Sequence, residues 1–254
     1  MKFDRITGVA VLLLAWEILA VSRFVPVLYF PAPPSVAVAG WDLLRSTGFV
    51  SQLGMTCLRM ASGLAIATAV GLAMAIATAR YRMLFHMLEP AVNMLRVLPP
   101  PAIVPLSIFA FGIGAPVFLF IVAFAAVWPI YINAASALGA IEPVLFVTGR
   151  SFGYSSWEIL LRLRLPAAMP EIVTGFRFGA GTALLATVAA EMLAGQSGLG
   201  FMLYDAAFTL RTRDMFAIMA IIGVLGLALN GLIAQGSRLI VGWHLTMSGT
   251  GESG

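Results

Sequence analysis

Two acidic residues lie inside long apolar stretches, where a carboxyl group could carry a proton or bind a solute. Glu17 interrupts the first apolar stretch, and Glu191 lies near the end of a later one. A charge is costly in lipid, so such residues usually face the interior of a helix bundle or an aqueous path. The alternative is an interfacial carboxylate that reaches the headgroup level. The sequence favours this alternative, because both residues lie near predicted span ends.

The other reactive side chains form no catalytic or metal-binding pattern. Cys57 is the single cysteine, and His86 and His244 are far apart in the sequence. No Ser-x-x-Lys, His-Glu-x-x-His or Gly-x-Ser-x-Gly pattern occurs. Lys2 is the single lysine, and a phosphate-binding P-loop requires a lysine within its glycine-rich pattern. We therefore expect no catalytic residue, metal or cofactor here, and any ATP and Mg²⁺ must be bound by another subunit.

The composition indicates a membrane protein built of helices. Of 254 residues, 61% are hydrophobic and only 10% are charged, with a mean hydropathy of +0.99. Soluble domains carry about 25% charged residues, so most of this surface must face lipid. The apolar stretches are long and continuous, which favours helices over a barrel. The net charge of +4 is typical of basic cytoplasmic loops, and we expect no nucleic-acid partner.

The predicted fold is an all-α, polytopic bundle in which residues 1–254 form one transmembrane domain. Six spans are expected, at Ile6–Phe24, Met55–Ala79, Val92–Phe111, Ala115–Ser136, Thr174–Ala194 and Met215–Gly236. The first follows a basic start and could be a cleaved signal peptide. Asp4 and Glu17 favour a retained helix.

Charge placement predicts the orientation. Placing the N-terminus inside puts most of the 15 Lys and Arg residues in inner segments, so both termini are expected in the cytoplasm. The segment 137–173 is then a long inner loop, and Val25–Gly54 is a proline-rich outer connection. The polar tail at 248–254 is expected to be disordered.

The inner loop contains the strongest local pattern. Ser155 lies three residues before Glu158, which is typical of a capping box. The predicted helix runs from about Ser156 until Pro166 stops it, after a bend at Gly153. Glu158 and Arg162 have the spacing of a surface ion pair.

One face of this predicted helix is apolar, with Trp157, Leu160, Leu161 and Leu165 expected to share it. An apolar face outside the bilayer needs a cover. The helix could pack on its own bundle, lie on lipid, or dock into a groove of a partner protein. The residue pattern alone does not distinguish between these three possibilities.

Two further features each allow a functional and a plainer interpretation. Pro99, Pro100 and Pro105 fall inside the third predicted span, where a broken helix could line a transport path. They could equally mark a kink or a late helix start. Arg211 and Arg213 could contact an anionic substrate or an acidic protein, although a solvated loop is the favoured interpretation.

The inner loop resembles the EAA signature of ATP-binding-cassette importer permeases. That signature places a glycine, nine residues, an apolar residue, any residue, Leu and Pro; this chain has Gly153, nine residues, then Leu163-Arg164-Leu165-Pro166. The continuation to Pro170, Gly175 and Arg177 is similar to the sulfonate, taurine, nitrate and bicarbonate branch. One departure is Val147-Thr148-Gly149, where Glu-Ala-Ala would stand.

The resemblance extends over about residues 10 to 245. It includes Trp16-Glu17, Pro31–Ser35, Leu98-Pro99-Pro100, Pro105, Phe111-Gly112-Ile113-Gly114, Trp128-Pro129, Asn133, Gly139, Ala190-Glu191-Met192 and Gly198-Leu199-Gly200.

The resemblance implies a bacterial inner-membrane permease of the type I, MetI-like fold. Two copies would form a dimer in the lipid bilayer, two cytoplasmic ATPases would bind beneath, and a periplasmic or lipid-anchored protein would deliver the solute. The implied coupling residues are Arg150, Gly153, Ser155, Trp157, Glu158, Arg162, Leu163, Leu165 and Pro166. The candidate path residues rest on the proline breaks and the intramembrane acid instead, and they are Pro99, Pro100, Pro105 and Glu191. Small organic or inorganic anions would be the substrates.

The rival interpretation is a stand-alone secondary transporter or channel. Glu17, Glu191 and the proline-broken third span would then couple transport to an ion. The capped helix of the inner loop has no obvious role in such a protein.

Overall fold

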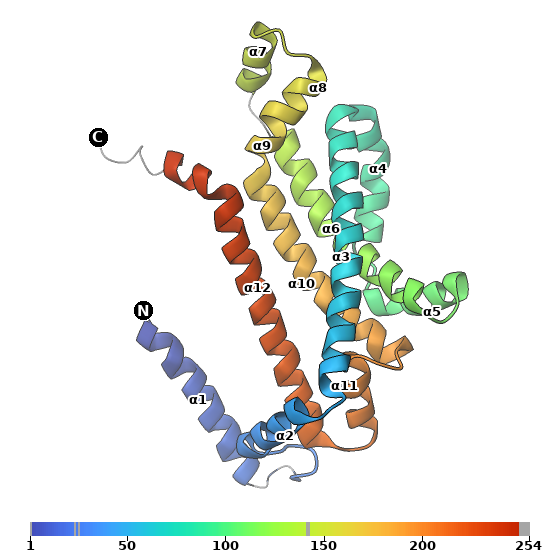
Figure 1. The fold of residues 1–254 in the computed structure, drawn as a ribbon, viewed down its shortest axis with the longest axis vertical. Helices are drawn as coiled ribbons and strands as arrows, with labels where there is room; N and C mark the ends of the chain where they lie inside the picture. The colour runs from blue at the N-terminus through green and yellow to red at the C-terminus, as the bar shows by residue number, and fades with distance from the viewer. Residues whose placement is uncertain (1, 23, 25, 141–142, 249–254) are drawn as a thin grey trace. The chain divides into compact units, whose positions relative to one another are not determined.

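The computed structural model describes residues 2–22, 24, 26–140 and 143–248, and this part of the chain is helical with no strand (Figure 1). The all-α prediction is therefore confirmed. The helices are α1 (Lys2–Val21), α2 (Pro33–Arg45), α3 (Phe49–Arg80), α4 (Arg82–Leu95), α5 (Pro100–Phe111), α6 (Ala115–Gly139), α7 (Pro143–Ser151), α8 (Ser156–Glu158), a π-helix η1 (Ile159–Arg164), α9 (Leu165–Ala167), α10 (Met169–Ala194), α11 (Leu199–Phe208) and α12 (Thr212–Ser248). Ser248 ends α12, and the rest of the predicted tail lies outside the described residues.

Four of the described helices are long and apolar enough to cross a membrane. These are α3, α6, α10 and the part of α12 from Thr212 to Arg238. The helices α4 and α5 count as a fifth span only if the pair is taken together, since it bends by 103°. The apolar part of α1, Thr7–Val21, is shorter than the other spans. A multi-span bundle is thus confirmed, with four to five spans by length and composition rather than six.

The prolines explain why the third predicted span is not one helix. Pro99 is extended, with φ −67° and ψ 134°, and α5 begins at Pro100. A residue that precedes a proline is disfavoured in the helical region, whereas proline suits the first turn of a helix. The prediction of a single helix over Val92–Phe111 is wrong for this reason, and the late-start interpretation holds for α5.

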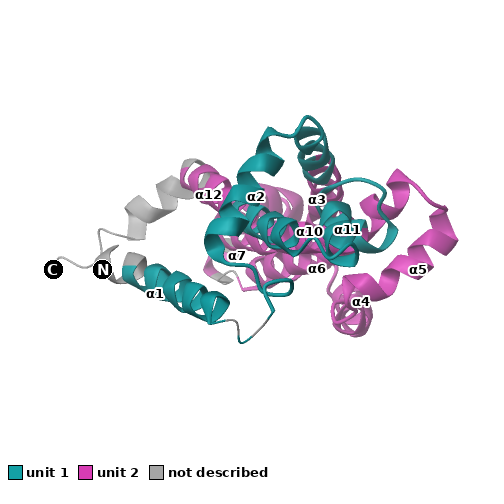
Figure 2. Cartoon of the chain, turned by 90° about the horizontal axis from the view of Figure 1, so that it is seen from below, with its two compact units in different colours: residues 1–57, 191–225 teal, residues 58–190, 226–254 magenta. Residues whose placement is uncertain are grey.

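The chain divides into two compact units (Figure 2). Unit 1 comprises residues 1–57 and 191–225, and unit 2 comprises residues 58–190 and 226–254. The unit boundaries fall inside α3, α10 and α12. The prediction of one permease domain stays a prediction.

Unit 1 is built around two apolar clusters. Phe49 and Ile218 are buried together with Leu199 and Ala206 of α11. A second cluster stacks Trp16 of α1 against Phe30 and Phe216, with ring centroids 5.7–6.1 Å apart. The Trp16 indole N–H donates to the Pro31 carbonyl at 3.1 Å, which ties α1 to the segment before α2.

Unit 2 is organised by close packing against α6. The residues Tyr131, Ala134 and Leu138 of α6 are buried with residues of α3, α4 and α10. Gly175 of α10 lies so near Asn133 that an added Cβ would be 2.7 Å from the Asn133 Cβ. Small residues allow this approach, which drives helix association in lipid through van der Waals contact.

This close approach predicts different effects for two neighbouring glycines of α10. Gly175→Ala forces Cβ against Cβ and should lower the free energy of unfolding by about 1–3 kcal/mol. Gly181→Ala is the matched control, since its added Cβ meets nothing within 4 Å. The midpoint of heat denaturation in detergent is the measurement. Equal midpoints for the two variants would contradict the packing described.

Candidate functional site

The inner loop contains the predicted bend and cap. Gly153 has φ +79°, a left-handed conformation that suits glycine. The Ser155 hydroxyl accepts the Glu158 N–H at 3.3 Å, and the Glu158 carboxylate accepts the Ser155 N–H at 2.9 Å. The capping box is therefore confirmed. Two helix-terminal N–H groups that would otherwise lack partners are satisfied within the loop itself.

This cap also holds Glu158 in its charged form. The Ser155 backbone N–H lowers the pKa of Glu158 most, followed by the Ser155 hydroxyl and the positive charge of Arg162. Arg162 lies 3.9 Å away at the predicted i, i+4 spacing. Because the pKa is lowered on folding, the cap's contribution to stability is present above the unfolded pKa and is lost as pH falls through the folded value.

The expected end of the helix at Pro166 is wrong. Residues Ile159–Arg164 form a π-helix, and Pro166 lies in the first turn of α9, which leads on into α10. The Leu165 N–H bonds to the Leu160 carbonyl, five residues back. This wider turn moves the register so that Pro166 falls where a missing N–H costs no helix hydrogen bond.

The wider turn also changes which side chains are covered. Ile159 and Leu160 are buried, whereas Trp157 and Leu161 are both 48% exposed. The prediction that Trp157, Leu160, Leu161 and Leu165 share one face is therefore wrong, because it assumed a regular α-helical period. A prediction that assumes regular α-helical periodicity cannot identify a π-turn in the sequence.

Two contacts hold the π-helix in place. An added Cβ on Gly149 of α7 would be 2.7 Å from the Ile159 side chain and 2.9 Å from that of Leu163. Gly149 stands at the last position of the departure from Glu-Ala-Ala, so this position needs a very small residue. The Arg164 guanidinium donates to the Leu138 carbonyl near the end of α6, and burial lowers the pKa of Arg164.

These contacts leave five apolar side chains of the inner loop 48–75% exposed: Val144, Val147, Phe152, Trp157 and Leu161. We refer to the five together as the loop surface. None of the candidate spans among the described residues includes it. Of the predicted coupling residues, Arg150, Gly153, Ser155 and Arg162 are also exposed, whereas Leu163, Leu165 and Pro166 are partly buried. Apolar patches on a surface that water reaches mark interaction sites.

Glu191 has a different role from the interfacial one that its position suggested. Its side chain is fully buried in unit 1, where the Thr56 hydroxyl donates to its carboxyl group at 2.9 Å and the Gly200 N–H at 3.0 Å. The interfacial interpretation is therefore wrong. Thr56 in turn accepts the Leu199 N–H at 2.8 Å, and Gln52 accepts the Gly198 N–H.

The start of α11 is thus capped by side chains from two other helices. Gly198 must be glycine here, because its φ is +102° and an added Cβ would lie 2.2 Å from the Glu191 carboxyl group. The Gly198-Leu199-Gly200 run was visible in the sequence, whereas Gln52 and Thr56 were not identified as part of the site. Glycines that follow an acidic residue in an apolar stretch are the signal that points to such a cap.

Glu191 belongs to unit 1, and the other predicted path residues belong to unit 2. Pro99 and Pro105 are exposed and Pro100 is partly buried, and all three belong to unit 2. Glu17 is partly buried, and its Oε2 atom has no hydrogen-bond partner among the described residues. The path assignments stay predictions.

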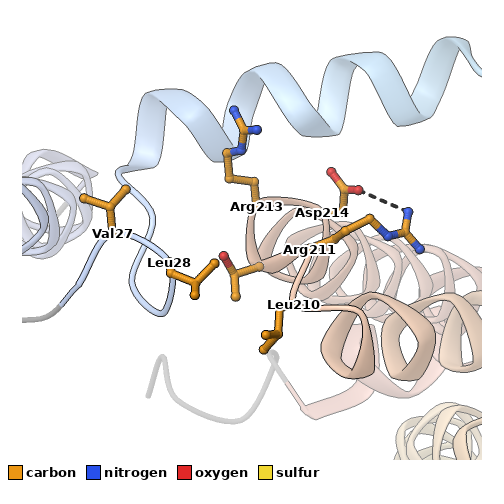
Figure 3. Close-up of a pocket in the computed structure, with 7 residues that line it drawn as sticks. Val27, Leu28, Leu210, Arg211, Arg213 and Asp214 are labelled. Atoms are coloured by element: carbon orange, nitrogen blue, oxygen red, sulfur yellow. Dashed lines mark hydrogen bonds and ion pairs between the residues drawn. The ribbon is translucent and has the colours of Figure 1, made fainter.

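The two arginines at the start of α12 have different surroundings. Arg211, just before the helix, forms an ion pair with Asp214 at 3.3 Å (Figure 3). It also forms an ion pair with Asp205, so its charge is neutralised locally. Arg213 points away from this pair and lines two cavities of unit 1, of ≈ 510 and ≈ 530 Å³. Unlike Arg211, Arg213 forms no ion pair with any residue that the structure describes.

Comparison with known proteins decides the family. Residues 67–241 match the family described as the binding-protein-dependent transport system inner membrane component. The chain belongs to this family. It is a multi-pass permease component of an importer, and the family match decides against a stand-alone secondary transporter or channel.

Relatives of this permease support the branch that its motifs resemble. It is 33% identical to a putative ABC transporter permease of Methanocaldococcus jannaschii, over 89% of this chain and 86% of the relative. It is 32% identical to a nitrate import permease of Leptolyngbya laminosa, over 79% and 75%. Other relatives are named as permeases for aliphatic sulfonates, taurine and bicarbonate.

A solved structure confirms the fold. A chain of the MetNI methionine ABC transporter in an inward facing conformation superposes with a TM-score of 0.61, covering 81% of this permease and 95% of that chain. The identity is 19%, so the likeness shows the MetI-like fold alone.

The capped start of α11 gives a direct prediction. Glu191→Ala leaves the buried Gly200 N–H without its acceptor and should lower the free energy of unfolding by about 1–3 kcal/mol. Thr187→Ala is the control, since Thr187 is equally buried on α10 and its hydroxyl bonds to Ala183 within the same helix. Denaturation in detergent should show the larger loss for Glu191→Ala. A larger loss for the control would contradict the capping role.

Proposed function

We propose that the loop surface docks this permease onto a cytoplasmic ATPase and transmits its movement to the membrane helices. The observation that carries the proposal is a set of exposed apolar side chains on α7, α8 and η1, which flank the bend at Gly153 and the cap at Ser155. Such a surface can fill a hydrophobic groove of a partner in the manner of other helix-in-groove contacts. The segment between Gly153 and Pro166 is the coupling element.

The way the loop is held supports this role. The cap at Ser155 fixes one end of the element, and Gly149 and Leu138 hold its π-helix against α7 and α6. The element then runs through α9 into α10 with only Ala168 between them. A force on the loop surface is therefore applied to the start of a membrane-spanning helix.

The family match supports a proposal for the rest of the assembly. We propose a homodimer of this permease in a bacterial inner membrane, with both termini in the cytoplasm, two ATPases that bind ATP and Mg²⁺, and a periplasmic or lipid-anchored binding protein. This chain holds no cofactor in the proposal. Small organic or inorganic anions are the proposed cargo, supported by relatives named for nitrate, sulfonates, taurine and bicarbonate.

Removing the loop surface tests the docking proposal. Trp157→Ala with Leu161→Ala should reduce ATPase retained on the detergent-extracted permease at least tenfold, which corresponds to about 1.4 kcal/mol. Both side chains are half exposed, so the fold should be unaffected. Leu28→Ala with Leu210→Ala removes a similarly exposed apolar pair elsewhere and should retain the ATPase. Full retention by the loop variant would refute the proposal.

Reversing the charge of Arg213 tests the contact with the binding protein. Arg213→Glu should weaken binding-protein affinity about tenfold and make the loss smaller at high salt, because exposed charges are screened. Arg45→Glu is the control with the same change of charge. The native Arg45 side chain stacks on Trp41. Titration of the complete transporter with binding protein is the measurement. Equal losses of affinity in the two variants would show that Arg213 does not contact the binding protein.

A further inference from the structure

A cavity of ≈ 200 Å³ lies between the first turns of α10 and the later part of α12, and all of its residues belong to unit 2. Its polar lining consists of Thr174 and Arg177 from α10 and Ser237 and Arg238 from α12. The remaining lining is apolar and consists of Pro170, Val173 and Ile233. The cavity shares no residue with the loop surface or with the cap of α11.

The two arginines give this cavity a positive charge that its own lining does not compensate. No acidic residue lines the cavity, and neither arginine forms an ion pair with any residue that the structure describes. In α10, the acid closest in sequence to Arg177 is Glu171, which lies about 120° around the helix from it. In α12, the only acid is Asp214, at the opposite end of the helix from Arg238.

The hydrogen bonds at the cavity show which donors are available to a ligand. The Thr174 and Ser237 hydroxyls each donate to a carbonyl of their own helix at 2.9 Å. The Arg177 Nε donates to the Asn230 side-chain oxygen, which joins α10 to α12. The terminal amino groups of Arg177 and the whole guanidinium of Arg238 make no hydrogen bond with any described residue. The ligand that fits is therefore an anion that accepts from guanidinium groups, as phosphate does.

The position of the cavity indicates a lipid as the source of this anion. Arg177 and Arg238 both lie within candidate membrane spans, and only 11% of the apolar window of α12 is buried within the chain. An arginine on a lipid-facing helix is costly unless it is paired or reaches the headgroup level. Basic pockets between membrane-spanning helices bind anionic headgroups. Val173 and Ile233 add apolar contacts beside the two charges.

We propose that this cavity binds the phosphate of an anionic phospholipid, with both guanidinium groups donating to its oxygens. Phosphatidylglycerol has this chemistry, whereas phosphatidylcholine also carries a quaternary ammonium group that two arginines repel. The bound headgroup bridges α10 and α12 beside the hydrogen bond between Arg177 and Asn230. The inference goes beyond the docking proposal and uses no step of it. A soluble oxyanion carries the same acceptor atoms, so the test separates the two sources.

The test measures which lipid the full-length permease retains in detergent. Equimolar phosphatidylglycerol and phosphatidylcholine with identical acyl chains are added, free lipid is removed, and bound lipid is quantified by mass spectrometry. The native chain should retain phosphatidylglycerol with about tenfold preference, because each arginine near the membrane surface attracts anionic lipid. Arg238→Gln should lower this preference roughly threefold. Adding Arg177→Gln should remove it.

Two controls separate the site from its surroundings. Asn230→Ala removes the hydrogen bond between the helices but no charge, so it should keep the native preference. Arg82→Gln with Arg96→Gln removes two exposed arginines of unit 2 that do not line this cavity, and it should also keep the preference. Arg238→Gln breaks no hydrogen bond with a described residue, so its effect is not that of a lost helix contact.

Equal losses of preference in the two arginine pairs would overturn the inference, because they would show a general attraction to the basic face. A native chain without any preference would overturn it as well. In nanodiscs of phosphatidylcholine, binding of inorganic phosphate that Arg238→Gln abolishes, with an unchanged lipid preference in detergent, would assign the cavity to a soluble oxyanion. An arginine-pair variant that loses its dimer but keeps its lipid preference would assign the two arginines to a contact between copies.

Discussion

Backbone groups that leave a helix inside an apolar environment must find new partners, and this constraint shapes the molecule at three places. At the junction of α4 and α5, prolines remove donors and the second helix starts afresh at Pro100. At the start of α11, Glu191 and Thr56 accept N–H groups that the helix cannot satisfy. At Pro166, a π-turn absorbs the missing donor without ending the helix. At each of these three places, the same interactions also set the direction in which the next helix runs.

The π-turn at Pro166 is the feature on which the proposed docking role depends. A π-turn in the inner loop keeps Ile159 and Leu160 buried while Trp157 and Leu161 stay exposed. A regular helix that ended at Pro166 would have separated the loop from α10. Because the turn lets the helix continue, η1 runs through α9 toward the candidate span α10. In the proposed function, a force on the loop surface reaches α10 along this path.

The sequence predicted what depends on neighbouring residues. The cap at Ser155, the bend at Gly153 and four long spans were all visible, because capping, left-handed glycine and hydropathy are local properties. Prediction from the sequence failed where contacts between residues far apart in the chain determine the structure. Thr56 caps a helix that begins 143 residues later, and Tyr131 and Arg96 line one cavity only after α4 and α6 pack. The π-turn was missed because a period of 3.6 residues was assumed.

Solute uptake into proteoliposomes tests the central claim most directly. The permease is reconstituted with and without its ATPase, and binding protein and solute are added outside. The account predicts uptake only when the ATPase is present and ATP is enclosed, and no uptake driven by a proton or sodium gradient. Uptake by the permease alone, driven by an ion gradient, would contradict the claim that the loop surface couples transport to ATP hydrolysis.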